Sequence, residues 1–112
     1  MNMSEFDNEQ VDDLVSEFFE QELQEVILKS NIPEVKKVAD MLRKGEVEFG
    51  EFFSDHPGKH LTTIYIDILG DSLKPIAHVR AKAEFYWNSK YSNWSTGDIK
   101  QDSLKVVWGK GA

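Results

Sequence analysis

The apolar residues near the start of the chain recur at helical spacing. At about 100° per residue, the apolar side chains between residues 8 and 29 fall on one arc of a helix, and the acidic and amide side chains fall on the opposite arc. The apolar arc holds Val11, Leu14, Val15, Phe18, Phe19 and Val26. The polar arc holds Glu9, Asp13, Glu17, Glu20 and Gln24. The pattern predicts an amphipathic helix from about residue 8 to 29, with Asp7 as its N-cap.

Glu22 interrupts this pattern, because helical spacing projects it into the apolar arc. A carboxylate buried there would need a partner or a proton. If the apolar stripe turns toward Leu23 and Ile27 instead, Glu22 lies at its edge. We favour the edge position and keep Glu22 as a minor site candidate.

A second helix is expected after the break at NIPE, residues 31–34. Pro33 suits the first turn of a helix, and Gly45 suits the position just after a helix end. The apolar face between them consists of Val35, Val38, Ala39 and Leu42. The two helices predict a helical hairpin over residues 7–45, preceded by residues 1–6, which we expect to fray.

The apolar spacing changes to two after residue 60, as in β-strands. Ile64, Ile66 and Ile68 share one face of a strand, and the odd-numbered residues from Ala77 to Trp87 share one face of the next. A polar loop is predicted over 88–98, followed by a last strand whose inner face begins with Leu104, Val106 and Trp108. Residues 46–53 fit either a short strand or a helical turn.

Helices followed by strands favour an α+β fold. We predict a single domain over residues 1–112, in which two antiparallel N-terminal helices pack on a three- or four-stranded antiparallel β-sheet. A β-meander is expected over 61–108. A hydrophobic share of 40% is enough for a packed core.

Five aromatic residues lie within AEFYWNSKYSNW, residues 83–94. Phe85 and Trp87 share the face of the strand that the period assigns to the core. The other three are either contact residues for a partner or a cap over the sheet edge, and the pattern leaves both open: Tyr86, Tyr91 and Trp94.

The net charge of −7 is unevenly distributed: residues 1–28 carry −9, residues 29–58 carry −1, and residues 59–112 carry +3. A chain this acidic is a poor ligand for free nucleic acid, because phosphates bind lysine and arginine. The acidic helix is either a solvated face or a surface that attracts a basic partner.

The composition excludes several kinds of chemistry. The chain contains no cysteine, which excludes disulfides, thiolate zinc sites and cysteine nucleophiles. The beginning, MNMSEFDNEQVDD, is acidic where a secretory signal would be basic and then apolar. No apolar run approaches the roughly 18 residues of a membrane span. We therefore expect a cytoplasmic protein.

Residues 40–51 resemble the calcium loop of EF-hand proteins. Four positions match its first ligand, turn glycine, apolar residue and bidentate glutamate: Asp40, Gly45, Val47 and Glu51. The resemblance covers twelve residues and departs from the family at Leu42 and Lys44, where the loop needs oxygen ligands. We therefore predict no metal site, and no cofactor.

The histidines suggest two further sites. His78 alternates onto the same outer strand face as Arg80, where the pair could act as an acid–base group beside a phosphate-binding arginine, as a small ribonuclease needs. Asp55, His56 and His60 could converge in a loop and hold a weak metal. Because the chain has no phosphate loop, nucleophile elbow or zinc motif, we predict that it is not an enzyme.

The charge pattern indicates a small inhibitory binding protein of the immunity-protein or antitoxin kind, which blocks a basic nuclease or another toxin acting on nucleic acid. The expected contacts are the acidic stripe and the aromatic residues: Glu9, Asp13, Glu17, Glu20, Tyr86, Tyr91 and Trp94. The alternatives are an acidic adaptor that self-associates through its sheet and a small enzyme that uses His78 and Arg80.

Overall fold

The computed structural model describes the backbone of residues 8–55 and 61–109, and the side chains in these ranges except those of residues 8–14 and Trp87. In this part of the chain two helices, α1 (Asn8–Lys29) and α2 (Pro33–Arg43), precede the strands. The strands are β1 (Glu48–Asp55), β2 (Leu61–Leu69), β3 (Pro75–Asn88) and β4 (Asn93–Trp108), with a short 3-10 turn, η2 (Asp71–Leu73), between β2 and β3. The predicted α+β fold is confirmed: two helices precede an antiparallel sheet.

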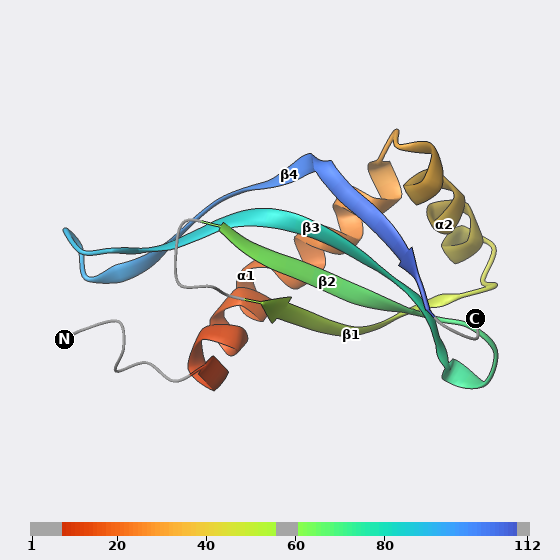
Figure 1. Cartoon of the computed structure of the whole chain (residues 1–112), viewed down its shortest axis with the longest axis horizontal. Helices are drawn as coiled ribbons and strands as arrows, with labels where there is room; N and C mark the ends of the chain where they lie inside the picture. Colours follow the sequence, from red (N-terminus) through yellow and green to blue (C-terminus); the bar gives the residue numbers. More distant parts are fainter. Residues whose placement is uncertain (1–7, 56–60, 110–112) are drawn as a thin grey trace.

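The four strands of this region form one antiparallel sheet in the order β1-β2-β3-β4 (Figure 1). α1 lies across one face of the sheet and contacts all four strands, while α2 packs chiefly against α1 and β4. We call the face under α1 the inner face and the opposite face the outer face. The buried strand residues of the inner face are Thr62, Ile64, Ile66, Ile68, Ala77, Val79, Ala81, Ala83, Phe85, Ile99, Leu104 and Val106.

The apolar stripe of α1 consists of residues four apart. It is fully buried against the sheet and comprises Val15, Phe19, Leu23 and Ile27. Because each four-residue step advances about 40° around the helix, the stripe turns toward Leu23 and Ile27. Glu22 therefore lies half-buried at the edge of the stripe, as we favoured from the sequence. The same turn moves Phe18, which the pattern assigned to the core, to a position where it is 44% exposed.

α2 begins and ends where its sequence signals lie. Pro33 occupies the start of the helix, where its missing amide hydrogen costs nothing. Gly45 follows the helix with φ of +76°, a conformation that favours glycine, and its amide donates to the Leu42 carbonyl at 3.2 Å. The predicted helix stop is thus confirmed.

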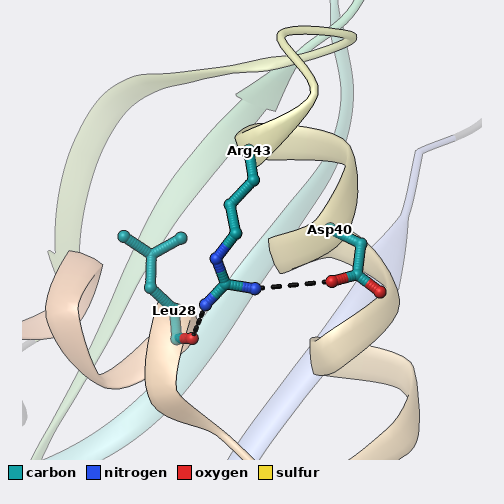
Figure 2. A network of polar contacts seen from close by, with 3 residues as sticks. All are labelled: Leu28, Asp40 and Arg43. Atoms are coloured by element: carbon teal, nitrogen blue, oxygen red, sulfur yellow. Dashed lines mark hydrogen bonds and ion pairs between the residues drawn. The ribbon is translucent and has the colours of Figure 1, made fainter.

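Arg43 connects the two helices (Figure 2). Its guanidinium donates a hydrogen bond to the Leu28 carbonyl in the last turn of α1 and pairs with the Asp40 carboxylate at 3.4 Å. The last carbonyls of a helix have no partner within the helix, so this bond satisfies one of them and ties α2 to α1.

Residues 46–53, which were ambiguous in the sequence, lead into and form most of strand β1. Phe49 and Phe52 pair with Ile68 and Ile66 of β2, and the register shifts between the two pairs. This bulge lets both rings pack against the core although they are an odd number of residues apart. The extra residue explains why alternation alone did not decide between strand and helix.

The polar loop predicted over residues 88–98 is wrong, because β4 begins at Asn93. The turn covers residues 89–92, and Trp94 pairs with Trp87 immediately after it. This end of the β3–β4 hairpin extends beyond the other two strands (Figure 1). Both of its faces meet more solvent there, so its polar residues do not alternate with apolar ones as in a half-buried strand.

Substitution of Leu23 tests how far the fold depends on the α1 stripe. Leu23 is fully buried, and we expect Leu23→Ala to lower the free energy of unfolding by about 2–5 kcal/mol. Leu73 is 65% exposed, so the matched control Leu73→Ala should change it by less than about 0.5 kcal/mol. Urea unfolding followed by circular dichroism measures both values. Equal losses in the two variants would contradict the packing described here.

Candidate functional site

An aromatic cluster joins α1 to the β3–β4 hairpin on the inner face. The rings of Phe85 and Trp94 stack, with centroids 4.7 Å apart and planes at 5°. Phe18 and Phe19 approach Phe85 from α1, each with a centroid separation of 6.3 Å. Phe19 and Phe85 are buried, so the cluster reaches the surface through exposed Phe18 and half-buried Trp94.

Three carboxylates lie near one another between α1 and β4, because the charges of Asp98 on β4 and of Glu25 on α1 both act on Glu22 of α1. Glu22 and Glu25 follow Phe18 by four and seven residues, so they lie on the same side of the helix. Asp98 lies in a bulge, because residues 96–99 of β4 pair along a stretch that residues 83–85 cover in β3. A bulge re-aims the side chains beside it. We call the surface formed by Phe18, Glu22, Glu25, Trp94 and Asp98 the α1–β4 seam.

The pKa of Glu22 reflects its burial and, to a smaller extent, these neighbouring charges. Burial raises the pKa of Glu22 above its ordinary value of 4.5, and repulsion from Asp98 and then from Glu25 raises it further. Within the described residues, none of the three carboxylates pairs with a lysine or arginine. A positive charge brought to the α1–β4 seam would relieve the repulsion.

The described part of the predicted acidic stripe, Glu17 and Glu20, lies on other sides of α1 than Glu22. Glu17 is exposed, and half-buried Glu20 accepts a hydrogen bond from Ser16 Oγ at 3.0 Å. Glu20 is about 160° around the helix from Glu22, so it faces away from the α1–β4 seam. The side chains of Glu9 and Asp13 lie outside the described residues, although their backbone belongs to α1.

The aromatic residues predicted as partner contacts do not share one surface. Tyr86 is half-buried on the outer face. Tyr91 lies in the hairpin turn, 65% exposed, with the Lys90 ammonium 5.4 Å from its ring centroid. Trp94 lies on the inner face, stacked on Phe85. Trp94 therefore packs at the margin of the core, while Tyr91 is accessible to a partner.

Sequence reasoning missed three residues of this surface. It assigned Phe18 to the apolar arc and Asp98 to a loop, and it did not single out Glu25. One signal was present for Asp98, because an isolated glycine within a strand often marks a bulge. A Cβ added to Gly97 would lie 2.8 Å from side-chain atoms of Glu84, so this position has no room for a larger residue.

The outer face carries a row of rings and, beside it, cations. Phe53 stacks on Tyr65 with centroids 5.4 Å apart, and His78 lies 5.4 Å from Tyr65 on the other side. Arg80 is exposed and pairs with Tyr65 in the strand ladder. His78 and Arg80 thus share one open face, as their alternation indicated. That the protein is not an enzyme stays a prediction.

Only one of the two candidate metal sites lies wholly within the described residues. The segment that resembles an EF-hand loop runs from α2 into β1, with Asp40 paired to Arg43 and Glu51 in the strand, so it is not a helix-loop-helix calcium module. His56 and His60 lie outside the described residues. Among the residues described, no three His, Cys, Asp or Glu side chains lie together as metal ligands would.

No family model, no curated protein and no solved structure matches the chain. In the described ranges, neither helix has both the length and the apolar character needed to cross a bilayer.

The raised pKa of Glu22 predicts a specific pH dependence of stability. The folded protein holds this proton more tightly than the unfolded chain does, so the contribution of Glu22 to stability falls as the pH rises above about 4.5. Glu22→Gln removes that loss, so the variant should gain stability relative to wild type between about pH 4 and pH 7. Urea unfolding at several pH values measures the difference in free energy of unfolding between variant and wild type. Glu34→Gln, at an exposed position of α2, is the control. A difference that stays constant with pH would contradict the raised pKa of Glu22.

Proposed function

We propose that this protein is a small inhibitory binding protein, of the immunity-protein or antitoxin kind, which docks through the α1–β4 seam onto a basic protein that acts on nucleic acid. One observation carries the proposal: Glu22 is half-buried, feels the like charges of Asp98 and Glu25, and lies one helical turn from exposed Phe18. Charges held against their mutual repulsion favour a partner that brings cations.

The α1–β4 seam combines two components of strong interfaces. Aromatic side chains near the centre of an interface supply much of the binding energy, and charged groups around them steer the encounter. Phe18 and Trp94 rest on the buried ring of Phe85, so their positions are set before a partner arrives. Such preorganisation reduces the entropy lost on association.

Proteins that act on nucleic acid offer the complementary surface. Their clefts carry lysine and arginine that bind phosphates, and spaced carboxylates on a stiff helix can take the place of those phosphates. Glu17 is exposed on the adjoining side of α1. The charge of −9 over residues 1–28 would add long-range attraction for a basic partner.

Self-association is the second candidate, and the strand order favours it. β1 and β4 are the two edges of the sheet described here. A strand edge presents backbone groups that can pair with another copy of the chain. Such an interface would depend little on salt, whereas charge-steered docking weakens steeply as ionic strength rises.

A charge-neutralised variant tests the α1–β4 seam. Glu22→Gln/Glu25→Gln/Asp98→Asn keeps the side-chain shapes and removes three charges. The tagged wild-type protein first captures its partner from the organism that encodes it, and surface plasmon resonance then measures association. We expect a basic partner whose activity on nucleic acid the wild type inhibits. At low salt, the variant should associate at least about tenfold more slowly.

The matched control is Glu34→Gln/Glu51→Gln/Asp71→Asn, which removes the same charges from exposed positions on α2, β1 and η2. It should associate close to the wild-type rate. If both triple variants slow equally, total charge matters and the α1–β4 seam does not. If neither slows, the docking surface is wrong, and a captured second copy of the chain would support self-association.

A further inference from the structure

The outer face contains a hollow that the proposed function does not use. It lies where the pairing of β3 with β4 is interrupted, so that residues 101–104 of β4 stand opposite Ala81 alone. Ser103 Oγ accepts a hydrogen bond from the Lys82 amide at 2.8 Å and donates one to the Lys100 carbonyl. A side chain thus takes over backbone bonds of the ladder and keeps the bulge open.

Cations and hydroxyl groups line this hollow. Its volume is about 290 Å³, and its lining residues are Thr63, Arg80, Ala81, Lys82, Ser103 and Lys105. Small-molecule sites usually measure about 300–1,000 Å³. The hollow therefore suits a small charged group better than a large apolar ligand.

The three cations of the hollow form no ion pair within the described residues. Arg80, Lys82 and Lys105 are exposed, and in the part of the chain that the structure describes none of them pairs with a carboxylate. Glu84, an acid of the same strand, lies 3.5 Å from Lys100 instead. The guanidinium of Arg80 and the two ammonium groups match the oxygens of a phosphoryl group, whereas the Ser103 hydroxyl already donates its hydrogen to the Lys100 carbonyl.

The row of rings on the outer face adjoins the hollow. Tyr65 pairs with Arg80 across β2 and β3, and Phe53 and His78 flank its ring. A planar ring joined to the phosphoryl group can stack against such a row. We propose that the hollow binds the phosphate of a nucleotide whose base lies against Tyr65 and His78.

A free mononucleotide and a nucleic acid strand share this chemistry. The net charge of −7 opposes a long polyanion, so a mononucleotide is the occupant we assign. The hollow lies on the outer face and the α1–β4 seam on the inner side, so this inference does not depend on the proposed function.

Titration followed by amide NMR tests the site with three probes: adenosine 5′-monophosphate, inorganic phosphate and adenosine. Both phosphate-bearing probes should give saturable shifts at residues 80–82 and 103–105, and adenosine should bind far more weakly. The mononucleotide should bind roughly tenfold tighter than phosphate, which is the order of one stacking contact.

Two variants separate the phosphate contact from the stacking contact. Arg80→Gln should weaken the binding of both the mononucleotide and phosphate at least about fivefold. Tyr65→Leu should remove the advantage of the mononucleotide and leave phosphate binding unchanged.

Lys74→Gln is the matched control, because Lys74 is an exposed cation about 20 Å along the chain from Arg80. It should bind both probes as the wild type does. The site is wrong if Lys74→Gln weakens binding as much as Arg80→Gln, or if the wild type shows no saturable shift up to about 10 mM probe. Binding of a short single-stranded oligonucleotide without binding of the mononucleotide would overturn the assigned occupant. Amide spectra of each variant confirm that it is folded.

Discussion

The packing of α1 on an inner face of small side chains is the contact on which the rest of the structure depends. β3 places Ala77, Ala81 and Ala83 under the helix, and these alanines leave room for rings such as Phe19 to reach the sheet. Each large side chain buried this way contributes about 1.5–3 kcal/mol. Since α1 and α2 occupy the inner side, the outer face of the described sheet has no second layer and is open to ligands.

The direction of the α1 stripe also decides what lies at its margin. The drift of about 40° per four-residue step carries Leu23 and Ile27 into the core and leaves Phe18 and Glu22 at its edge. The bulge at Asp98 then adds a carboxylate from the sheet. The α1–β4 seam therefore arises from two local geometries, and removal of either would separate its charges.

The helices and the buried faces of β2 and β3 could be predicted because their apolar residues recur at one spacing over most of each element. β1 and the start of β4 could not, since each departs from simple alternation: a bulge follows Phe49, and Asn93 opens a strand with solvent on both faces. The candidate sites depend on the same irregularities. Asp98 lies in a bulge and Ser103 replaces ladder bonds, and a periodic pattern contains no information about either. All the partner contacts predicted from the sequence, Glu9 and Asp13 among them, stay predictions.

Net charge describes this molecule poorly, because its acidic and basic surfaces lie on opposite sides of the sheet. A helix is about 10 Å across, and the Debye length at physiological ionic strength is about 8 Å. The carboxylates of the α1–β4 seam are therefore largely screened from the cations around the hollow, and a small ligand at either surface meets mainly the local charge. A long polyanion spans several Debye lengths and also meets the acidic surfaces that give the total of −7. A basic partner and a phosphate ligand do not compete for one surface. The same screening makes any energetic coupling between the two sites small, so the sheet separates them electrostatically as well as sterically.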